Sequence, residues 1–280
     1  MRFGYGTNGF TDHRIGDALA VLAHLGYDGV ALTLDHGHLD PFGTGVAARI
    51  DRVAGLLSRY KMAVVIETGA RYLLDPLRKH EPTLVSDDGR DHRLAYLRAA
   101  VEIGADLGAQ AVSFWSGTKP EHLAEDEAFD RLAEGCSAVI EHAERHDVVL
   151  GFEPEPGMLV EDLDGYERLH ALLGGPGRLG LTLDIGHLRC NEPLPVPESV
   201  LRAGGRIVNV QIDDMRRGVH EHLPFGEGEI DFPPVLAALD ATGYRGLVSV
   251  ELPRHGHAAP ATARHSLDFL RAAAPEGAAP

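Results

Sequence analysis

Four polar residues in the second half of the chain each follow a short apolar run, the pattern expected where a buried strand ends. They are Glu153, Asp184, Gln211 and Glu251, and roughly one strand-and-helix unit separates each from the next. In parallel α/β folds, the ligand site lies at the carboxyl ends of the strands. Carboxylates that meet there raise one another's pKa unless a cation neutralises them. The four residues therefore predict a site for a divalent metal ion.

The donor atoms of this set indicate which metal ion to expect. Three carboxylates and the neutral amide of Gln211 offer only oxygen, which suits Mn²⁺ or Mg²⁺ better than a thiolate-rich zinc site. We expect one ion per chain, Mn²⁺ first, with Mg²⁺ and Co²⁺ as alternatives. His220 and His222 share one face of an extended segment and are candidates for a second ion. In that case the site would be multinuclear and would hold Zn²⁺.

The same residues suit the transfer of a proton next to a carbonyl group. Such a reaction needs a base on one face of the substrate, a cation to polarise the carbonyl, and an acid on the other face. Glu153 and Glu251 are the candidates for the two proton-transfer roles. His187 and Arg217 are candidates for donating hydrogen bonds to substrate oxygens as charge develops.

Further residues near strand ends are candidates for substrate recognition. We expect Glu67, which follows the third apolar run, and Trp115, which ends the fourth, to contact substrate. We expect Glu155, which Pro154 separates from Glu153, to point away from the metal. The long polar segment beyond Glu67 either recognises an anionic group such as a phosphate or is a solvated loop. Its candidate residues are Arg71, Arg78, Lys79 and His80.

Strands and helices that alternate along the whole chain would position these residues. Hydrophobic periodicity predicts strands at 2–7, 29–34, 63–66, 111–115, 148–152, within 180–188 with a charged end at Asp184, at 207–212 and at 247–250. It predicts helices at 12–25, 46–60, 94–107, 125–146, 163–173, 233–241 and 261–273. Eight such units without a linker predict a single-domain (β/α)8 barrel over residues 1–280, with a fraying tail at about 273–280. A doubly wound sheet is the alternative, but no glycine-rich nucleotide-binding motif supports it.

Composition excludes several classes of protein. With 44% hydrophobic and 24% charged residues, the chain has the composition of a globular protein. Its formal net charge of −16 repels nucleic-acid phosphates and anionic membranes, so we expect neither as a partner. There is no long apolar run and no recognisable signal peptide, and the two cysteines fit a reduced compartment. We expect a soluble cytoplasmic protein, and the sequence leaves open whether it forms a dimer or tetramer.

With these residues the chain resembles the xylose-isomerase-like barrels of sugar and sugar-phosphate isomerases and epimerases, which include ketose 3-epimerases and hydroxypyruvate isomerases. The resemblance rests on the strand ending at Glu153, the segment 183–187, the strand ending near Gln211 with Arg217 six residues on, and Val250 with Glu251. It implies that Glu153, Asp184, Gln211 and Glu251 bind the metal and that His187 and Arg217 hold substrate. In the epimerases of this family, the residue at the position of Gln211 is usually His. The members that are similar to hydroxypyruvate isomerase carry Gln there.

The resemblance implies a metal-dependent isomerase or epimerase of a small sugar, sugar phosphate or related polyhydroxy carbonyl compound. Its reaction would pass through a metal-stabilised cis-enediolate, with the two Glu residues as acid and base. One alternative is a metal-dependent phosphoester hydrolase like the multinuclear endonuclease branch of the same superfamily. However, the third and fourth strands end at Glu67 and Ser116, where that branch would supply histidines. The other alternative is a barrel that has lost catalysis and acts as a binding protein in a biosynthetic pathway.

Overall fold

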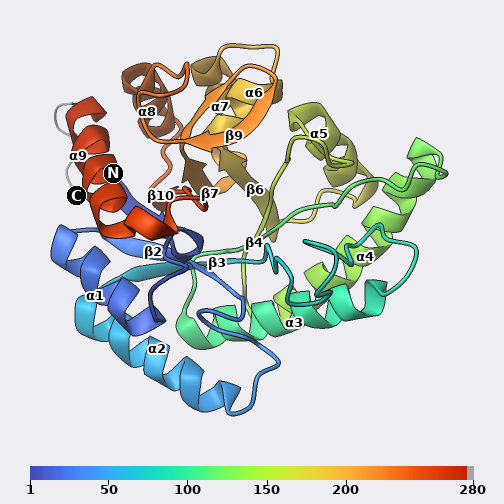
Figure 1. Ribbon diagram of the computed structural model, residues 1–280. Coiled ribbons are helices and arrows are strands. Elements are labelled where there is room, and N and C mark those ends of the chain that lie inside the picture. The colour runs from blue at the N-terminus through green and yellow to red at the C-terminus, as the bar shows by residue number, and fades with distance from the viewer. Residues whose placement is uncertain (276–280) are drawn as a thin grey trace.

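Eight parallel strands close into a barrel at the centre of the molecule, and helices surround it (Figure 1). The computed structural model describes residues 1–275. Neighbouring strands around the barrel follow the order β1 (Arg2–Gly6), β10 (Leu247–Val250), β7 (Ile207–Ile212), β6 (Leu179–Asp184), β5 (Leu150–Phe152), β4 (Val112–Phe114), β3 (Ala63–Glu67) and β2 (Gly29–Thr33). This closed arrangement confirms the predicted (β/α)8 fold, and a doubly wound sheet is ruled out.

The barrel strands are apolar because they are covered on both sides. Every residue of β2 and of β6 is buried, as expected where helices pack outside a parallel sheet and side chains fill its interior. Most buried apolar side chains belong to one connected cluster. The strands begin and end at or close to the predicted residues. Strand periodicity therefore placed the candidate site residues correctly at the strand ends.

The helices of the outer layer are α1 (Ile15–Leu25), α2 (Val46–Tyr60), α3 (Arg90–Leu107), α4 (Glu125–Arg145), α5 (Leu163–Leu172), α6 (Ile185–Asn191), α7 (Val196–Ala203), α8 (Phe232–Ala241) and α9 (Ala259–Ala273). Short 3-10 turns occur at Thr7–Gly9, Gly204–Arg206 and Gly256–Ala258. Helix α2 illustrates the pattern, since it buries Ile50, Val53 and Leu57 on one face. Helix α1 ends at Gly26, whose φ of 93° is readily adopted only by glycine.

Helix α3 begins four residues before its predicted start at position 94. Its first turn, from Arg90 to Arg93, is polar, so the hydrophobic period begins only at Leu94. Gly89 precedes the helix with a φ of 76°, which sets the direction in which the chain enters it. Arg93 is nevertheless fully buried and donates to the backbone carbonyl of Thr68 at 2.9 Å. The first turn of α3 therefore packs against the loop that follows β3.

An antiparallel hairpin, absent from the predicted elements, follows β7. It consists of β8 (Asp214–Arg216) and β9 (Val219–Leu223). The buried carboxylate of Asp214 organises it, because it accepts hydrogen bonds from the backbone N–H groups of Met215, Gly226, Gly228 and Ile230 at 2.9 to 3.1 Å. The hairpin holds the segment with His220 and His222 against α6.

The predicted single domain over residues 1–280 stays a prediction, and most of the predicted tail, residues 276–280, lies outside the described residues. Within residues 1–275, no helix is both long and apolar enough to cross a membrane.

Candidate active site at the carboxyl ends of the strands

A cavity of about 280 Å³ opens at the carboxyl ends of the barrel strands. Its walls carry carboxylates, imidazoles and cationic side chains. The carboxylates are Glu67, Glu153, Glu155 and Glu251, the imidazoles are His80, His187, His220 and His222, and the cations are Arg71, Lys79 and Arg254. Because these groups come from loops and strand ends far apart in the sequence, only the closed barrel brings them together.

The four predicted metal ligands come from four consecutive barrel strands. Glu153 directly follows β5, Asp184 ends β6, Gln211 lies in β7, and Glu251 directly follows β10. Asp184 and Gln211 are register partners, and the backbone N–H of Glu251 donates to Ile212 O at 3.1 Å on the neighbouring strand. Glu153 and Glu251 thus flank the central pair, as the sequence predicted for residues on adjacent strands.

Two oxygens of the central pair lack hydrogen-bond partners although they are buried. These are Oδ2 of Asp184 and Oε1 of Gln211. The Gln211 amide group donates to Glu67, so its oxygen is the atom left free. Buried polar atoms are nearly always paired, and unpaired ones call for an explanation. A cation bound between these oxygens would satisfy them, and the donors therefore fit an oxygen-ligated divalent metal ion.

The cavity carboxyl groups have raised pKa values because they are buried near one another. Burial, followed by the charge of Glu251, raises the pKa of Glu67 to about 8 and that of Glu155 to about 7. Burial raises the pKa of Glu153 well above its usual range, and Glu155 and Glu251 add to this effect. Burial also raises the pKa of Glu251. A bound divalent cation would favour the ionised forms and reverse these shifts.

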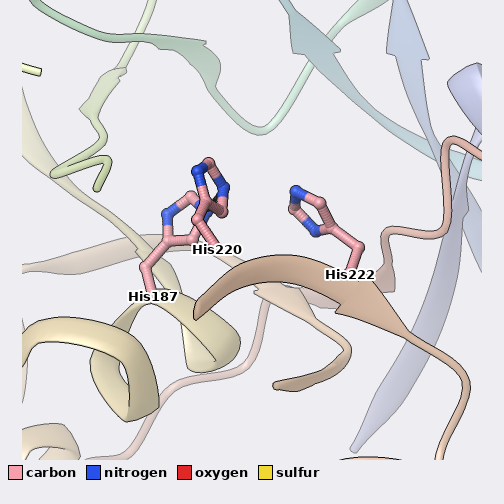
Figure 2. Close-up of side chains that lie close together, drawn as sticks. All are labelled: His187, His220 and His222. Atoms are coloured by element: carbon pink, nitrogen blue, oxygen red, sulfur yellow. Dashed lines mark hydrogen bonds between the residues drawn. The ribbon is translucent and has the colours of Figure 1, made fainter. Parts of the chain in front are cut away.

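Three histidines from two different elements lie close together (Figure 2). His187 lies on α6, while His220 and His222 lie on β9. The Nδ1 atom of His187 lies 3.2 Å from Pro154 O and its Nε2 atom lies 3.1 Å from Nε2 of His220. A hydrogen bond from Nδ1–H to Pro154 O would fix the tautomer and leave a lone pair on Nε2. Each of the three rings offers a nitrogen within 4.8 Å of the other two.

The histidine group is continuous with the carboxylate group. His222 Nδ1 contacts the carboxylate of Asp213. Burial lowers the pKa of His222, but Asp213 outweighs this and the pKa rises to about 10. Donor atoms of Asp184, Asp213 and His222 lie within 4.8 Å of one another, as do those of Glu153, Asp184 and His187. The predicted second metal ion at His220 and His222 stays a prediction, but the donors for it are assembled.

Two residues lie in places that the sequence did not predict, and their roles stay predictions. Arg217 does not line the cavity; its exposed side chain donates to the Glu192 carbonyl and its backbone N–H to Glu229 at 3.2 Å. Glu155 does line the cavity. Residues two apart in an extended chain face the same way, so alternation should have placed it on the same side as Glu153.

The other substrate-binding candidates lie where the sequence predicted them. Glu67 and Trp115 are both buried and line the cavity. The Arg93 guanidinium lies 4.3 Å from the centroid of the Trp115 ring and fixes that side chain from behind. Asn8, which the sequence did not single out, donates to Glu251 Oε1 at 2.8 Å. It lies just beyond β1, in a 3-10 turn without a hydrophobic period to mark it.

Comparison with known proteins finds relatives of this chain in sequence and in fold. Residues 19–273 match a family model described as the xylose isomerase-like TIM barrel. The L-ribulose-5-phosphate 3-epimerase UlaE of Salmonella paratyphi C is 30% identical over 195 residues, which is 68% of this chain and 68% of the relative.

Two solved structures show the same fold at lower sequence identity. The 3-keto-D-glucoside 4-epimerase YcjR of E. coli superposes with a TM-score of 0.79 at 17% identity, covering 97% of this chain and 99% of that one. The IolI protein, solved with a zinc atom, superposes with a TM-score of 0.76 at 17% identity, covering 98% of each chain. At these identities the likeness concerns the fold alone.

Proposed function

This chain belongs to the xylose isomerase-like TIM barrel family, and we propose that it is a divalent-metal-dependent epimerase or isomerase of a small polyhydroxy carbonyl compound. Membership of this family confirms the prediction that the chain is an enzyme of the sugar isomerase and epimerase class. The observation that carries the finer proposal is the unpaired, buried oxygens of Asp184 and Gln211, flanked by Glu153 and Glu251.

Glu153, Asp184, Gln211 and Glu251 would hold the metal ion. A divalent cation bound there would polarise the substrate carbonyl and stabilise the negative charge that develops on its oxygen. The oxygen-only donor set supports Mn²⁺ as the first candidate. The zinc atom in the IolI structure makes Zn²⁺ the main competitor.

Glu153 and Glu251 would transfer the proton, because they reach the cavity from the two outer strands of the set of four. One carboxylate removes the proton from the carbon next to the carbonyl, and the other carboxyl group returns one on the opposite face. The hydrogen bond from Asn8 orients Glu251. His187, held at Nδ1 by the Pro154 carbonyl, would accept a hydrogen bond from a substrate hydroxyl group at Nε2.

The test is solvent-deuterium incorporation into a panel of substrates, together with metal analysis of the purified protein. The panel contains ketoses, inososes, hydroxypyruvate and, because of the Salmonella relative, L-ribulose and L-ribulose 5-phosphate. We expect one essential metal ion per chain and exchange at the carbon next to the carbonyl of one panel member. Loss of exchange on chelation and its return with Mn²⁺ would support the proposal, whereas exchange that survives complete removal of metal would refute it.

One observation favours a second candidate function, phosphoester hydrolysis. The nitrogens of His187, His220 and His222 are assembled next to the acidic group that contains Asp184, which would suit more than one Zn²⁺ ion. Two or more metal ions per chain, with hydrolysis of a phosphodiester and no deuterium exchange, would select this function instead.

A further inference from the structure

Three cationic side chains line the otherwise acidic cavity and come from two separate loops. Arg71 and Lys79 belong to the loop between β3 and α3, and Arg254 follows β10. Arg71 Nη2 donates to Pro253 O at 3.5 Å, so the two loops lie side by side at the cavity. This group is distinct from the four candidate metal ligands, none of which is cationic.

The loop that carries Arg71 and Lys79 is held in a defined conformation by its own hydrogen bonds. The backbone N–H of His80 donates to Arg71 O at 2.6 Å, and its Nδ1 lies 2.5 Å from Gly69 O. These contacts bring Lys79 beside Arg71 although eight positions separate them. The His80 ring also packs edge-on against Trp115, with centroids 5.4 Å apart. The cavity-lining part of this segment is therefore held in place, although Lys79 itself is exposed to solvent.

The backbone of this loop is unusual for residues with side chains. Ala70, Arg71 and His80 have φ values of 58°, 47° and 70°, in the left-handed region that favours glycine. Such conformations persist only where the surroundings impose them, and they cluster at ligand-binding sites. Two of these three residues, Arg71 and His80, line the cavity.

Few direct ion pairs or hydrogen bonds engage the cationic side chains of the group. Among the described residues, Lys79 forms no ion pair and no hydrogen bond. Although Lys79 is exposed, partial loss of its hydration lowers its pKa, and the charge of Arg71 lowers it further, against a smaller attraction from Glu155. Arg254 forms one exposed ion pair, with Glu221 at 3.2 Å. In the same loop, by contrast, Arg78 points away from the cavity and pairs with Asp75 at 2.7 Å.

We propose that Arg71, Lys79 and Arg254 form a subsite for the phosphate monoester of a phosphorylated substrate. Planar guanidinium groups donate two parallel hydrogen bonds to a phosphate, and lysine adds a compact charge. A phosphate monoester carries close to two negative charges at neutral pH, which suits three cations better than a singly charged carboxylate does. The inference rests on the proposed function, because the carbonyl end of the same molecule would lie at the metal ligands.

Kinetics on matched substrate pairs test the subsite. The metal-loaded enzyme is assayed with phosphorylated and free forms of the same ketose, and the ratio of the two kcat/KM values is measured. We expect the wild type to favour the phosphorylated form and Lys79→Gln or Arg71→Gln to reduce that ratio by about 10- to 100-fold. The neighbouring Arg78→Gln is the matched control and should leave the ratio unchanged, since Arg78 lies outside the cavity.

Direct binding keeps the test independent of turnover. Titration calorimetry with inorganic phosphate should show binding to the metal-loaded wild type and to Arg78→Gln, and at least tenfold weaker binding to Lys79→Gln. Circular dichroism checks that each variant is folded. An equal loss on both substrate forms, a preference for a sugar acid over the phosphate, or undiminished phosphate binding by Lys79→Gln would overturn the subsite. If no panel member reacts but phosphate binding depends on Lys79, the proposed reaction fails and the subsite stands.

Discussion

The carboxylate of Asp184 has one oxygen bound to the backbone of His187 and one without a partner. Oδ1 accepts a hydrogen bond from the His187 N–H at 2.8 Å and so caps the start of α6. Oδ2 is buried and unpaired. The cap orients the carboxylate, and the free oxygen is available to a cation. The same residue can therefore serve both the local fold and the site.

Replacement of Asp184 should separate these two roles. Asp184→Asn keeps a capping oxygen but removes the charge, so metal affinity should fall by at least about 100-fold while the melting temperature of the metal-free protein changes little. Asp184→Ala should lose metal and also about 1 kcal/mol of cap stability. Elemental analysis and thermal melts measure both effects. Asp162, which caps α5 through Gly165 N at 2.8 Å, is the matched control: Asp162→Ala should lose stability only. Full metal occupancy in Asp184→Asn would contradict the assignment.

Glu251→Gln should retain part of the metal affinity but lose proton exchange. The amide can still offer an oxygen ligand but cannot accept a proton, so deuterium incorporation should fall by about 10²- to 10⁴-fold. Nuclear magnetic resonance of the substrate carbon–hydrogen bond follows the exchange, and metal content is measured in the same sample. Exchange at the normal rate would show that Glu251 is not one of the proton-transfer groups.

Arg217→Ala should change KM by less than about threefold, because its side chain contacts the Glu192 carbonyl outside the cavity. His187→Asn, within the cavity, should weaken substrate binding or turnover by a much larger factor, about 10-fold or more. Steady-state kinetics of the two variants decide between the role that family resemblance assigns to Arg217 and the position that the fold gives it. A large loss in Arg217→Ala alone would favour the former.

The metal-free protein should lose stability as the pH rises. The pKa of Glu67 is raised to about 8 and that of Glu155 to about 7, from an ordinary 4.5, by burial and then by Glu251. Carboxyl groups with raised folded-state pKa values stabilise the fold below the unfolded pKa, and that contribution is lost as the pH passes through the folded pKa. Melting temperatures of the metal-free protein should therefore decline by several degrees between about pH 5 and pH 8.

Added Mn²⁺ should raise the melting temperature most at pH 8, where these carboxylates are ionised. Glu67→Gln should flatten the decline because it removes one of the titrating groups. A melting temperature that is constant over this range without metal would argue against the mutual repulsion of the carboxylates.

Asp214→Ala should loosen the hairpin that carries His220 and His222. Four backbone N–H groups lose their acceptor in this variant, and we expect a loss of about 3 kcal/mol of unfolding free energy. Hydrogen exchange should increase from Asp214 to Ile230 and not in α2, on another part of the barrel. Unchanged protection of the hairpin would show that its strands hold without this carboxylate.

The sequence predicted the strand-end residues because burial imposes a period on apolar side chains. Glu153, Asp184, Gln211 and Glu251 each interrupt or end such a run, so their places in the barrel follow from the strand order. Gln211 replaces the family's usual histidine, but its unpaired side-chain oxygen can still serve as a metal ligand.

Loop residues could not be placed in the same way. Lys79 lines the cavity and Arg78 does not, and no hydrophobic pattern records the backbone bond between His80 and Arg71 that shapes their loop. The short strand Val219–Leu223 alternates histidines with other residues and is only partly buried, so it carries little apolar signal. Its position depends on Asp214, whose partners lie up to 16 residues along the chain.

The distribution of the site over the barrel has a consequence for how its specificity could change. The four candidate metal ligands belong to β5, β6, β7 and β10, whereas Arg71 and Lys79 lie on the segment between β3 and α3. A segment fixed at both ends by a strand and a helix can be exchanged for another without altering the reactive end of the pocket. The barrel therefore places the groups that react with the substrate and the groups that recognise it on different segments. Replacing residues 68–89 with the corresponding segment of a relative would be a way to change which substrate the enzyme accepts.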